Sequence, residues 1–295
     1  MWISLQRHPK DDASQTLVVD ESAAEPVRAL DDILTSLPRT KKEGQLLEAF
    51  HDANERLEEV RTLFTLGYLS LAQRALAESL YWRLLTALHK ALKKYADSSR
   101  SEVSEIERAL TDQYLCDFSV FQSMLDHWAI GQPFPIMPID RLDEQPDRRA
   151  VLVDLTCDSD GKVSHYVSSD PDRGFMKLHG LDPGQPYYLG FFLMGAYQDI
   201  MGDAHNLFGR VVEAHVYADA DEPGGYYIEK IIKGTTVQEM LAQVQYFPND
   251  LHRRMNTLIR QKTEAGEIRP KAGVQFLDQY MECFAETTYY RPDHL

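Results

Sequence analysis

The sequence predicts an α+β protein in which a helical bundle is followed by an all-β domain and a C-terminal helical extension. Three observations support this fold class. Leucines recur at three- and four-residue spacing between residues 41 and 96, as on the buried face of amphipathic helices. Apolar and β-branched residues typical of strands dominate residues 150–232. Helical spacing of apolar residues returns over residues 271–287. We expect the strands to form a Greek-key-like barrel or sandwich.

The composition narrows the class of protein. A chain of 295 residues, 43% hydrophobic and 26% charged, is typical of a soluble globular protein. No apolar run approaches the ~20 residues of a spanning helix and no signal peptide is visible, so we expect a cytoplasmic protein without a membrane partner. The net charge of −15 argues against a nucleic-acid partner, because phosphates would be repelled. Three widely spaced cysteines indicate a reducing compartment, not a disulfide framework.

Residues 1–25 show no helical or strand periodicity beyond the short run 16–19, so we expect a frayed or edge-strand arm. Residues 26–116 are expected to form the helical bundle, since antiparallel helices of this length can share one core. The leucine stripe is assigned to that core rather than to a partner-binding face. No catalytic constellation stands out in this part of the chain.

Four helices are expected within the bundle. The first begins near Pro26 and ends at Pro38. Ser70, with Gln73 three residues later, predicts a capping box at the start of the third helix. The second, third and fourth helices are expected over residues 41–65, 70–96 and 102–115.

Residues 117–234 are expected to form the β-domain. Three clustered prolines exclude a helix and predict an extended connector over residues 114–142. Strands are expected on both sides of a hairpin within residues 150–167, over the apolar run 187–194, and over 210–218 and 226–232; residues 168–185 are expected to be loop.

Residues 235–295 are expected to form the C-terminal helical extension. Thr236, with Glu239 three residues later, predicts a second capping box and a helix over residues 237–246. Asn249 is expected to cap the next helix, and an amphipathic helix is expected over residues 271–287.

The hairpin carries the first motif with chemical potential, Cys157-Asp158-Ser159-Asp160-Gly161. Asp, Ser and Gly are turn formers, so a thiol and two carboxylates are displayed together at the end of a rigid element. A solvated turn with an incidental cysteine is the structural alternative. Calcium binding is a weaker alternative, because further oxygen ligands are lacking.

The second motif lies where an apolar strand is expected to turn sharply into a helix at Gly195-Ala196. A helix start leaves backbone N–H groups that can face an anion such as phosphate. Tyr197 stands at this turn, with a ring to pack on a cofactor and a hydroxyl to donate to phosphate. As alternatives, Tyr197 is a core residue, and His205 is a core histidine with its hydrogen bonds satisfied. The spacing of Asp203 and His205 does not suit a metal site, and none is predicted.

Three stretches together resemble the C-terminal half of the bacterial biosynthetic arginine decarboxylases, which are pyridoxal-phosphate enzymes of the alanine-racemase-like (fold III) group. They are LTCDSDGKVSHY, PYYLGFFLMGAYQDIMGDAHNLFG and FSVFQSMLDHWAIGQPFPIMPIDRLDEQPDRRAVLVD. They occur in the family's order and at its spacing, and the resemblance runs from about Arg28 to about Tyr290. It implies that the barrel holding the cofactor lysine would precede residue 1 and is absent from this chain, and that the arm over residues 1–25 is the remnant of that preceding domain. One departure is Arg210, where relatives are expected to carry an acidic residue.

The resemblance implies a decarboxylase that makes agmatine from L-arginine for polyamine and spermidine biosynthesis, with pyridoxal 5'-phosphate and magnesium as cofactors. It implies that Cys157 approaches the cofactor from a neighbouring subunit and governs reprotonation. Asp158 would face the guanidinium of the substrate, with Asp160 as a less secure second carboxylate, and Tyr197 would touch the cofactor phosphate. The implied partner is another copy of the protein or a barrel-containing chain. Without the lysine, the chain alone is expected to be inactive.

Two other functions stay open at this point. A related decarboxylase could act on another basic amino acid or on diaminopimelate, because specificity also depends on the barrel. A chain of this kind could also be a non-catalytic regulator that pairs with a full-length enzyme.

Overall fold

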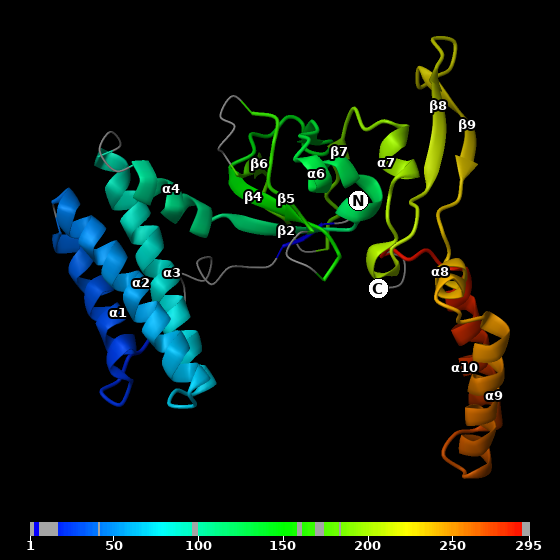
Figure 1. Cartoon of the computed structure of the whole chain (residues 1–295), viewed down its shortest axis with the longest axis horizontal. Coiled ribbons are helices and arrows are strands. Elements are labelled where there is room, and N and C mark those ends of the chain that lie inside the picture. Colours follow the sequence, from blue (N-terminus) through cyan, green and yellow to red (C-terminus); the bar gives the residue numbers. More distant parts are fainter. Residues whose placement is uncertain are drawn as a thin grey trace.

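The computed structural model describes residues 3–5, 17–40, 42–95, 100–157, 161–168, 174–182 and 184–290. The predicted order of a helical bundle, a strand-rich region and C-terminal helices is confirmed (Figure 1). The bundle and the C-terminal helices extend from opposite ends of the strand-rich region toward the same side of the molecule. None of the described helices combines the length and the apolarity needed to cross a bilayer.

The bundle is built from four helices around a leucine core. Leu30, Leu46, Leu84 and Leu88 are buried at its centre. The capping box predicted at Ser70 is confirmed, since its hydroxyl accepts the Gln73 N–H at 3.3 Å and the Gln73 side chain accepts the Ser70 N–H at 3.3 Å. The helices are α1 (Glu25–Ser36), α2 (Glu43–Thr65), α3 (Leu71–Leu92) and α4 (Arg100–Ala109), with 3-10 turns η2 (Leu37–Arg39) and η3 (Lys93–Tyr95).

The prediction that the fourth helix reaches residue 115 is wrong. Helix α4 ends at Ala109, and Asp112–Cys116 form strand β2, which runs parallel to β4 (Arg148–Val153). Tyr114 and Cys116 alternate with more exposed residues, as a strand requires. The buried Tyr114 hydroxyl also donates to the His179 carbonyl at 2.9 Å. Pairing with β4 therefore determines the structure of residues 112–116, although their local sequence pattern predicted that the helix continues.

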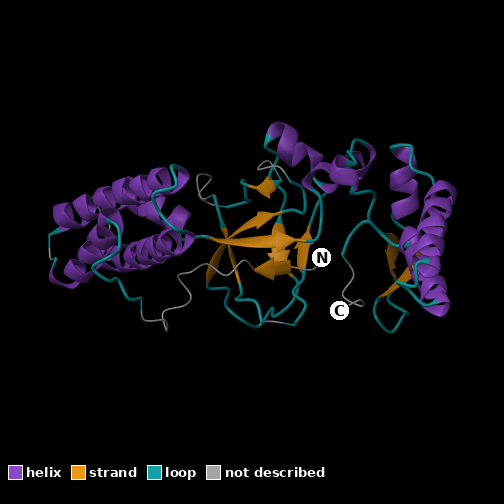
Figure 2. Ribbon diagram, turned by 90° about the horizontal axis from the view of Figure 1, so that it is seen from below, coloured by secondary structure: helices purple, strands orange, loops and turns teal. Residues whose placement is uncertain are grey.

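The strands form an open mixed sheet and two separate ribbons (Figure 2). Within the described residues they do not close into a barrel. The sheet has the order β1-β2-β4-β5, with β6 paired to β4, and its buried side chains include Leu152, Val163 and Leu178. The strands not yet bounded are β1 (Ile3–Leu5), β5 (Lys162–Val163) and β6 (Met176–Leu178) in the sheet, and β3 (Ile136–Pro138) with β7 (Leu189–Phe191) and β8 (Glu213–Ala218) with β9 (Tyr226–Ile232) in the ribbons.

Several expectations for the strand-rich region are corrected by the structure. Helices α5 (Val120–Ser123) and α6 (Leu125–Ile130) occupy part of the expected extended connector, since the prolines follow these helices instead of interrupting them. Strand β6 lies within the expected loop. Strand β7 covers only part of the apolar run, and Leu193 beyond it is 85% exposed.

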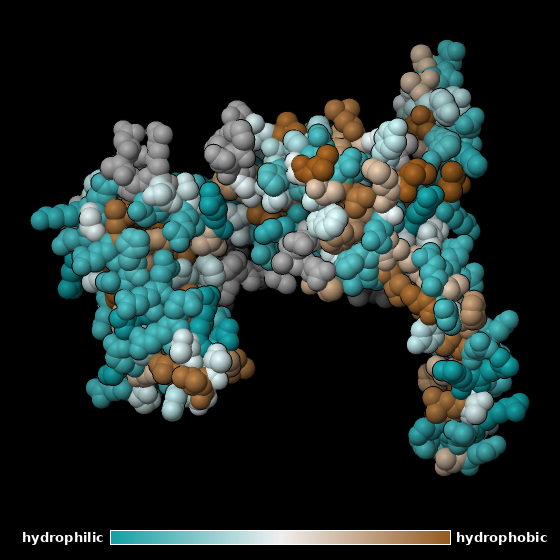
Figure 3. All heavy atoms as spheres, viewed as in Figure 1, coloured by the Kyte–Doolittle hydropathy of each residue, from teal (hydrophilic) through white to brown (hydrophobic). Residues whose placement is uncertain are grey.

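The β8–β9 ribbon stands apart from the sheet, and every residue of β9 is exposed. Both strands were predicted, and their pairing is antiparallel. Figure 3 shows apolar side chains along the base of this ribbon. The exposed apolar residues of its strands are Val216, Tyr217, Tyr226, Tyr227, Ile228, Ile231 and Ile232.

The C-terminal extension consists of α8 (Val237–Gln243), α9 (Pro248–Glu264), α10 (Pro270–Glu282) and the turn η5 (Cys283–Ala285). The capping box between Thr236 and Glu239 is confirmed. The expected cap at Asn249 is wrong, because α9 already begins at Pro248, which has no N–H in need of an acceptor. Helices α9 and α10 pack against each other.

Candidate functional site

The stem of the motif hairpin is organised by the buried carboxylate of Asp154. One of its oxygens accepts the N–H of Val120 at 2.8 Å, and the other accepts the N–H and hydroxyl of Thr156 at 2.8 and 2.6 Å. The Asp154 N–H donates to the Gly161 carbonyl at 2.7 Å, which closes the stem. These bonds hold the two sides of the hairpin stem together and bind the stem to the start of α5.

Gly161 is required for this arrangement. A Cβ at this position would lie 2.1 Å from Asp154 Oδ1 and 2.3 Å from Thr156 Oγ1, which real structures do not allow. The glycine of the motif is therefore explained by the close approach of the two sides of the stem. Asp158 and Asp160, the predicted carboxylates, lie outside the described residues.

The second motif folds back onto α5 and α6. Helix α7 (Ala196–Ile200) begins after Gly195, as the strand-to-helix prediction requires, but it has only one turn. The buried Gln198 accepts the Asp126 N–H at 3.1 Å and donates to the Asp126 carboxylate at 2.5 Å. These two bonds fix α7 on the start of α6.

Beyond α7 the chain approaches α5 very closely at Gly202. A Cβ here would lie 2.4 Å from the Gln122 carbonyl oxygen. The N–H of Asp203 donates to the Phe121 carbonyl at 2.9 Å, and the His205 ring lies 4.6 Å from the Phe121 ring. Helix α5 therefore carries the hairpin stem on one side and the segment after α7 on the other.

The two motifs meet at Cys157 and Asn206. The Cys157 N–H donates to Asn206 Oδ1 at 3.0 Å, and Asn206 Nδ2 donates to Cys157 Sγ at 3.4 Å. Asn206 lies in the 3-10 turn η4 (His205–Leu207), at φ 55° and ψ 25°. Cys157 is exposed, so its thiol remains accessible while the side chain is held.

Tyr197 and Cys157, the two predicted site residues that the structure describes, lie on segments joined by this contact. Tyr197 is 74% exposed, which excludes the core alternative within this chain. Because α7 has a single turn, its N-terminus offers an anion only a small dipole. Any phosphate contact here would rest mainly on the tyrosine hydroxyl.

Metal binding has no support in the described parts of the chain, where no group of three or more His, Cys, Asp or Glu side chains could hold an ion. Arg210, the departure noted in the sequence, lies 3.6 Å from the Asp199 carboxylate of α7. It pairs with an acidic residue at the surface and leaves the fold undisturbed.

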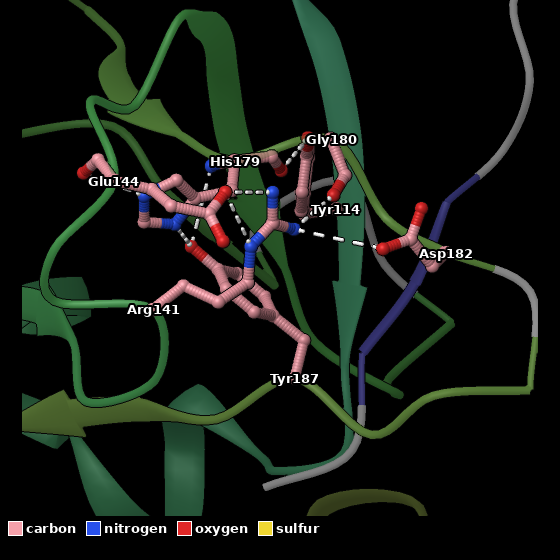
Figure 4. A network of polar contacts seen from close by, with 7 residues as sticks. All are labelled: Tyr114, Arg141, Glu144, His179, Gly180, Asp182 and Tyr187. Carbon is pink, nitrogen blue, oxygen red and sulfur yellow. Dashed lines mark hydrogen bonds and ion pairs between the residues drawn. The ribbon is translucent and has the colours of Figure 1, made fainter.

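A second polar network is centred on His179 and Arg141 and was not predicted (Figure 4). Tyr187 donates its hydroxyl proton to His179 Nδ1 at 2.8 Å, because His179 Nε2 must donate to the Glu144 carbonyl at 3.1 Å. Arg141 binds the Glu144 carboxylate and donates to the Gly180 carbonyl at 2.8 Å. The network ties the loop before β4 to the loop after β6, so its role is structural.

An apolar cavity of about 440 Å³ adjoins the hairpin stem at Phe118. Asp117 is its acidic residue, and burial raises the pKa of this carboxyl, while the N–H of Tyr290 donates to it at 3.1 Å. Met124, Phe191 and Met194 are among the remaining lining residues. Its largely apolar walls do not suit the charged ends of an amino acid, so the exposed Cys157–Tyr197 surface is the better candidate.

Sequence reasoning singled out Cys157 and Tyr197 but did not identify the residues that anchor their segments. Asp154, Gln198 and Asn206 are common polar types with no distinctive spacing, and their partners lie 34, 72 and 49 residues away. Gly161 and Gly202 were the available signal in the sequence, because a glycine inside a polar turn often marks a close approach of two backbone segments.

Two family models match the ends of the chain. The arginine decarboxylase helical bundle domain matches residues 20–107, and the arginine decarboxylase C-terminal helical extension matches residues 237–290. These are the parts of the chain that fold as the α1–α4 bundle and as α8–α10.

Relatives with the name biosynthetic arginine decarboxylase match across the intervening region as well. The chain is 42% identical over 273 residues to that of Bacteroides thetaiotaomicron, covering 92% of this chain and 42% of the relative. It is 47% identical over 219 residues to that of Gloeobacter violaceus, covering 74% of this chain and 33% of the relative. The crystal structure of the biosynthetic arginine decarboxylase SpeA from Campylobacter jejuni superposes with a TM-score of 0.73 at 32% identity, over 98% of this chain and 44% of that chain. The chain thus spans less than half the length of these relatives.

Proposed function

Because the chain belongs to the arginine decarboxylase family, we propose that it forms one wall of a decarboxylase active site that a barrel-bearing polypeptide completes. The complete enzyme would convert L-arginine to agmatine with loss of CO₂, on a route to polyamines. The observation that carries the proposal is the exposed thiol of Cys157, held on an anchored hairpin and joined to the segment that bears Tyr197.

In this proposal, pyridoxal phosphate supplies the chemistry by delocalising the electron pair left on Cα when CO₂ departs. Tyr197 would hold the phosphate through its hydroxyl, and Cys157 would deliver the proton to Cα from its side of the site. Asp158 would receive the guanidinium, since a carboxylate can accept two parallel bonds from that fork. Asp160 would add a second carboxylate.

The described residues suit one wall of such a site and not all of it. An exposed tyrosine and an exposed thiol are what a wall awaiting a second polypeptide needs. Every lysine that the structure describes is exposed on the surface, whereas a lysine that binds the cofactor covalently needs a pocket that lowers its pKa. In this proposal the partner therefore supplies the cofactor lysine. Magnesium stays a prediction of the family resemblance.

Reconstitution tests this proposal. The chain would be co-expressed with the part of the Bacteroides thetaiotaomicron relative that lies outside the match. We expect arginine decarboxylation by the pair, and neither activity nor a cofactor absorbance band with the chain alone. Cys157→Ser should reduce kcat by at least about 100-fold, as expected for loss of a positioned proton donor. Cys283→Ser, at an exposed thiol on the C-terminal extension, is the matched control and should be neutral.

Substrate class is tested in the same preparation by comparing arginine with ornithine, lysine and diaminopimelate. Asp158→Asn should raise KM for arginine more than kcat falls, because one charged acceptor is removed. A pair that assembles but is as active with Cys157→Ser as without it would contradict the proposed wall. A chain that binds an intact full-length enzyme and changes its rate would favour the regulatory function instead.

A further inference from the structure

We infer that Asn206 is the positioning residue for Cys157, and that its side-chain amide fixes both the backbone and the thiol of that cysteine. The inference rests on the proposed function for its purpose, but the contacts that carry it lie within this chain. The amide accepts the Cys157 N–H at 3.0 Å and donates to Cys157 Sγ at 3.4 Å. A single planar group thus holds two atoms of the same residue.

Each of the two bonds does a different thing. The bond to the N–H orients the hairpin at the point where the motif turn begins. The bond to Sγ selects one direction for the thiol, which would otherwise occupy several staggered rotamers in an exposed position. Because the amide donates to the sulfur, this bond does not consume the S–H proton. The thiol of Cys157 therefore keeps its proton free to donate to another group.

The backbone of Asn206 shows that this placement has a cost. Asn206 and the following Leu207 both have left-handed conformations, with φ of 55° and 64°. Asparagine tolerates this region better than most residues, but leucine does not. Strained backbone of this kind persists where surrounding contacts hold it, and it occurs preferentially at functional sites.

The surrounding contacts do hold Asn206 in place. The Asp203 N–H bond to the Phe121 carbonyl and the tilted contact of the His205 ring with the Phe121 ring fix the chain immediately before it. Helix α5 carries Phe121 and is itself bound to the hairpin stem through the Asp154 carboxylate. Cys157 and Asn206 are therefore brought together by two routes that both start at α5, and this makes their relative position rigid.

Two variants of Asn206 separate the two bonds. Asn206→Gly removes the amide but still accepts the left-handed conformation. Asn206→Asp keeps an acceptor for the Cys157 N–H, but it replaces the donor to Sγ with a carboxylate. In water, like charges about 3.4 Å apart repel enough to shift an equilibrium by roughly eightfold, so the carboxylate opposes the thiolate.

The experiment uses the purified chain. Iodoacetamide alkylation of Cys157 is followed by mass spectrometry between pH 6.5 and 9.5, with the exposed Cys283 in the same molecule as the reference. Hydrogen exchange of the peptide that contains Cys157 is measured in parallel. Asn206→Asp should slow the alkylation of Cys157 about eightfold relative to Cys283 near neutral pH, with normal amide protection. Asn206→Gly should instead lose the amide protection.

Unchanged alkylation in Asn206→Asp, together with unchanged amide protection in Asn206→Gly, would overturn the inference. A merely structural Asn206 would alter exchange in both variants and leave the pH dependence of alkylation alone, which would also overturn it. Neither readout needs a cofactor or a partner. If reconstituted activity proves indifferent to Cys157→Ser, the proposed function fails while the thiol measurement still decides the role of Asn206.

Discussion

Replacing Asp154 with alanine should loosen the whole hairpin stem. The carboxylate accepts two backbone donors, the N–H groups of Val120 and Thr156, and the hydroxyl of Thr156 as well. Leaving a buried donor without an acceptor costs about 1–3 kcal/mol. Two such donors put the expected loss at about 2–5 kcal/mol, given that Thr156 is only partly buried and water can reach its N–H.

The loss can be measured at a neighbouring thiol. Cys116 is completely buried in β2, beside strand β4, which ends one residue before Asp154, so a reagent reaches its thiol only when this part of the sheet opens. A loss of 2 kcal/mol predicts labelling that is roughly 30-fold faster in Asp154→Ala. Asp154→Asn keeps one acceptor oxygen and should have a smaller effect. Asp143→Ala, at an exposed aspartate before β4, should match the wild type.

Labelling of Cys116 in Asp154→Ala within about threefold of the wild type would refute this reasoning, since less than 1 kcal/mol would then separate the two chains. The Asp154 carboxylate would in that case be an accessory to the stem and not its organiser.

Three further predictions concern substitutions at tightly packed residues. Burial lowers the pKa of His127, whose Nε2 accepts a backbone N–H. The native state therefore takes up a proton less readily than the unfolded state. The stability contributed by the neutral ring is present above about pH 6.5 and is lost as the pH falls through the lowered pKa, so urea midpoints at pH 7.5 and 5.5 should differ less in His127→Gln than in the wild type. Gly202→Ala should cost about 1–3 kcal/mol in urea unfolding because its Cβ overlaps a backbone carbonyl, whereas Gly195→Ala, with open space around it, should cost less than about 1 kcal/mol, for the poorer N-cap. Leu84→Ala in the bundle core should lower the free energy of unfolding by about 2–5 kcal/mol, as followed by the helical circular dichroism signal. Leu71→Ala, at an exposed leucine, should change it by less than about 0.5 kcal/mol. Equal effects of the two glycine variants, or of the two leucine variants, would contradict the packing described.

The sequence predicted the features that depend on local chemistry. The capping boxes at Ser70 and Thr236 were found because each is completed within three residues. The helices of the bundle were found because their leucines share one face. The hairpin that carries the motif was found because apolar and β-branched residues flank its turn formers.

Features that depend on distant partners were not found. Strand β2 is set by its parallel pairing with β4, whose residues lie almost forty positions later in the chain. The role of Asn206 depends on a residue 49 positions away. Strand β6 was taken for loop because its three residues are too few to show a period. A single sequence contains no local record of such contacts.

The isolated β8–β9 ribbon has a practical consequence for handling the chain. Both outer edges of the ribbon present unpaired backbone donors and acceptors, and only β9 is interrupted, where the register shift opposite His215 and Val216 leaves Glu229 as an extra residue. Two strands without a covering layer are marginal in water, and aromatic and β-branched side chains on β9 invite edge-to-edge growth. Concentrated stocks of the lone polypeptide should therefore turn cloudy or gel on storage, and a lysine introduced at Ile228 should delay that.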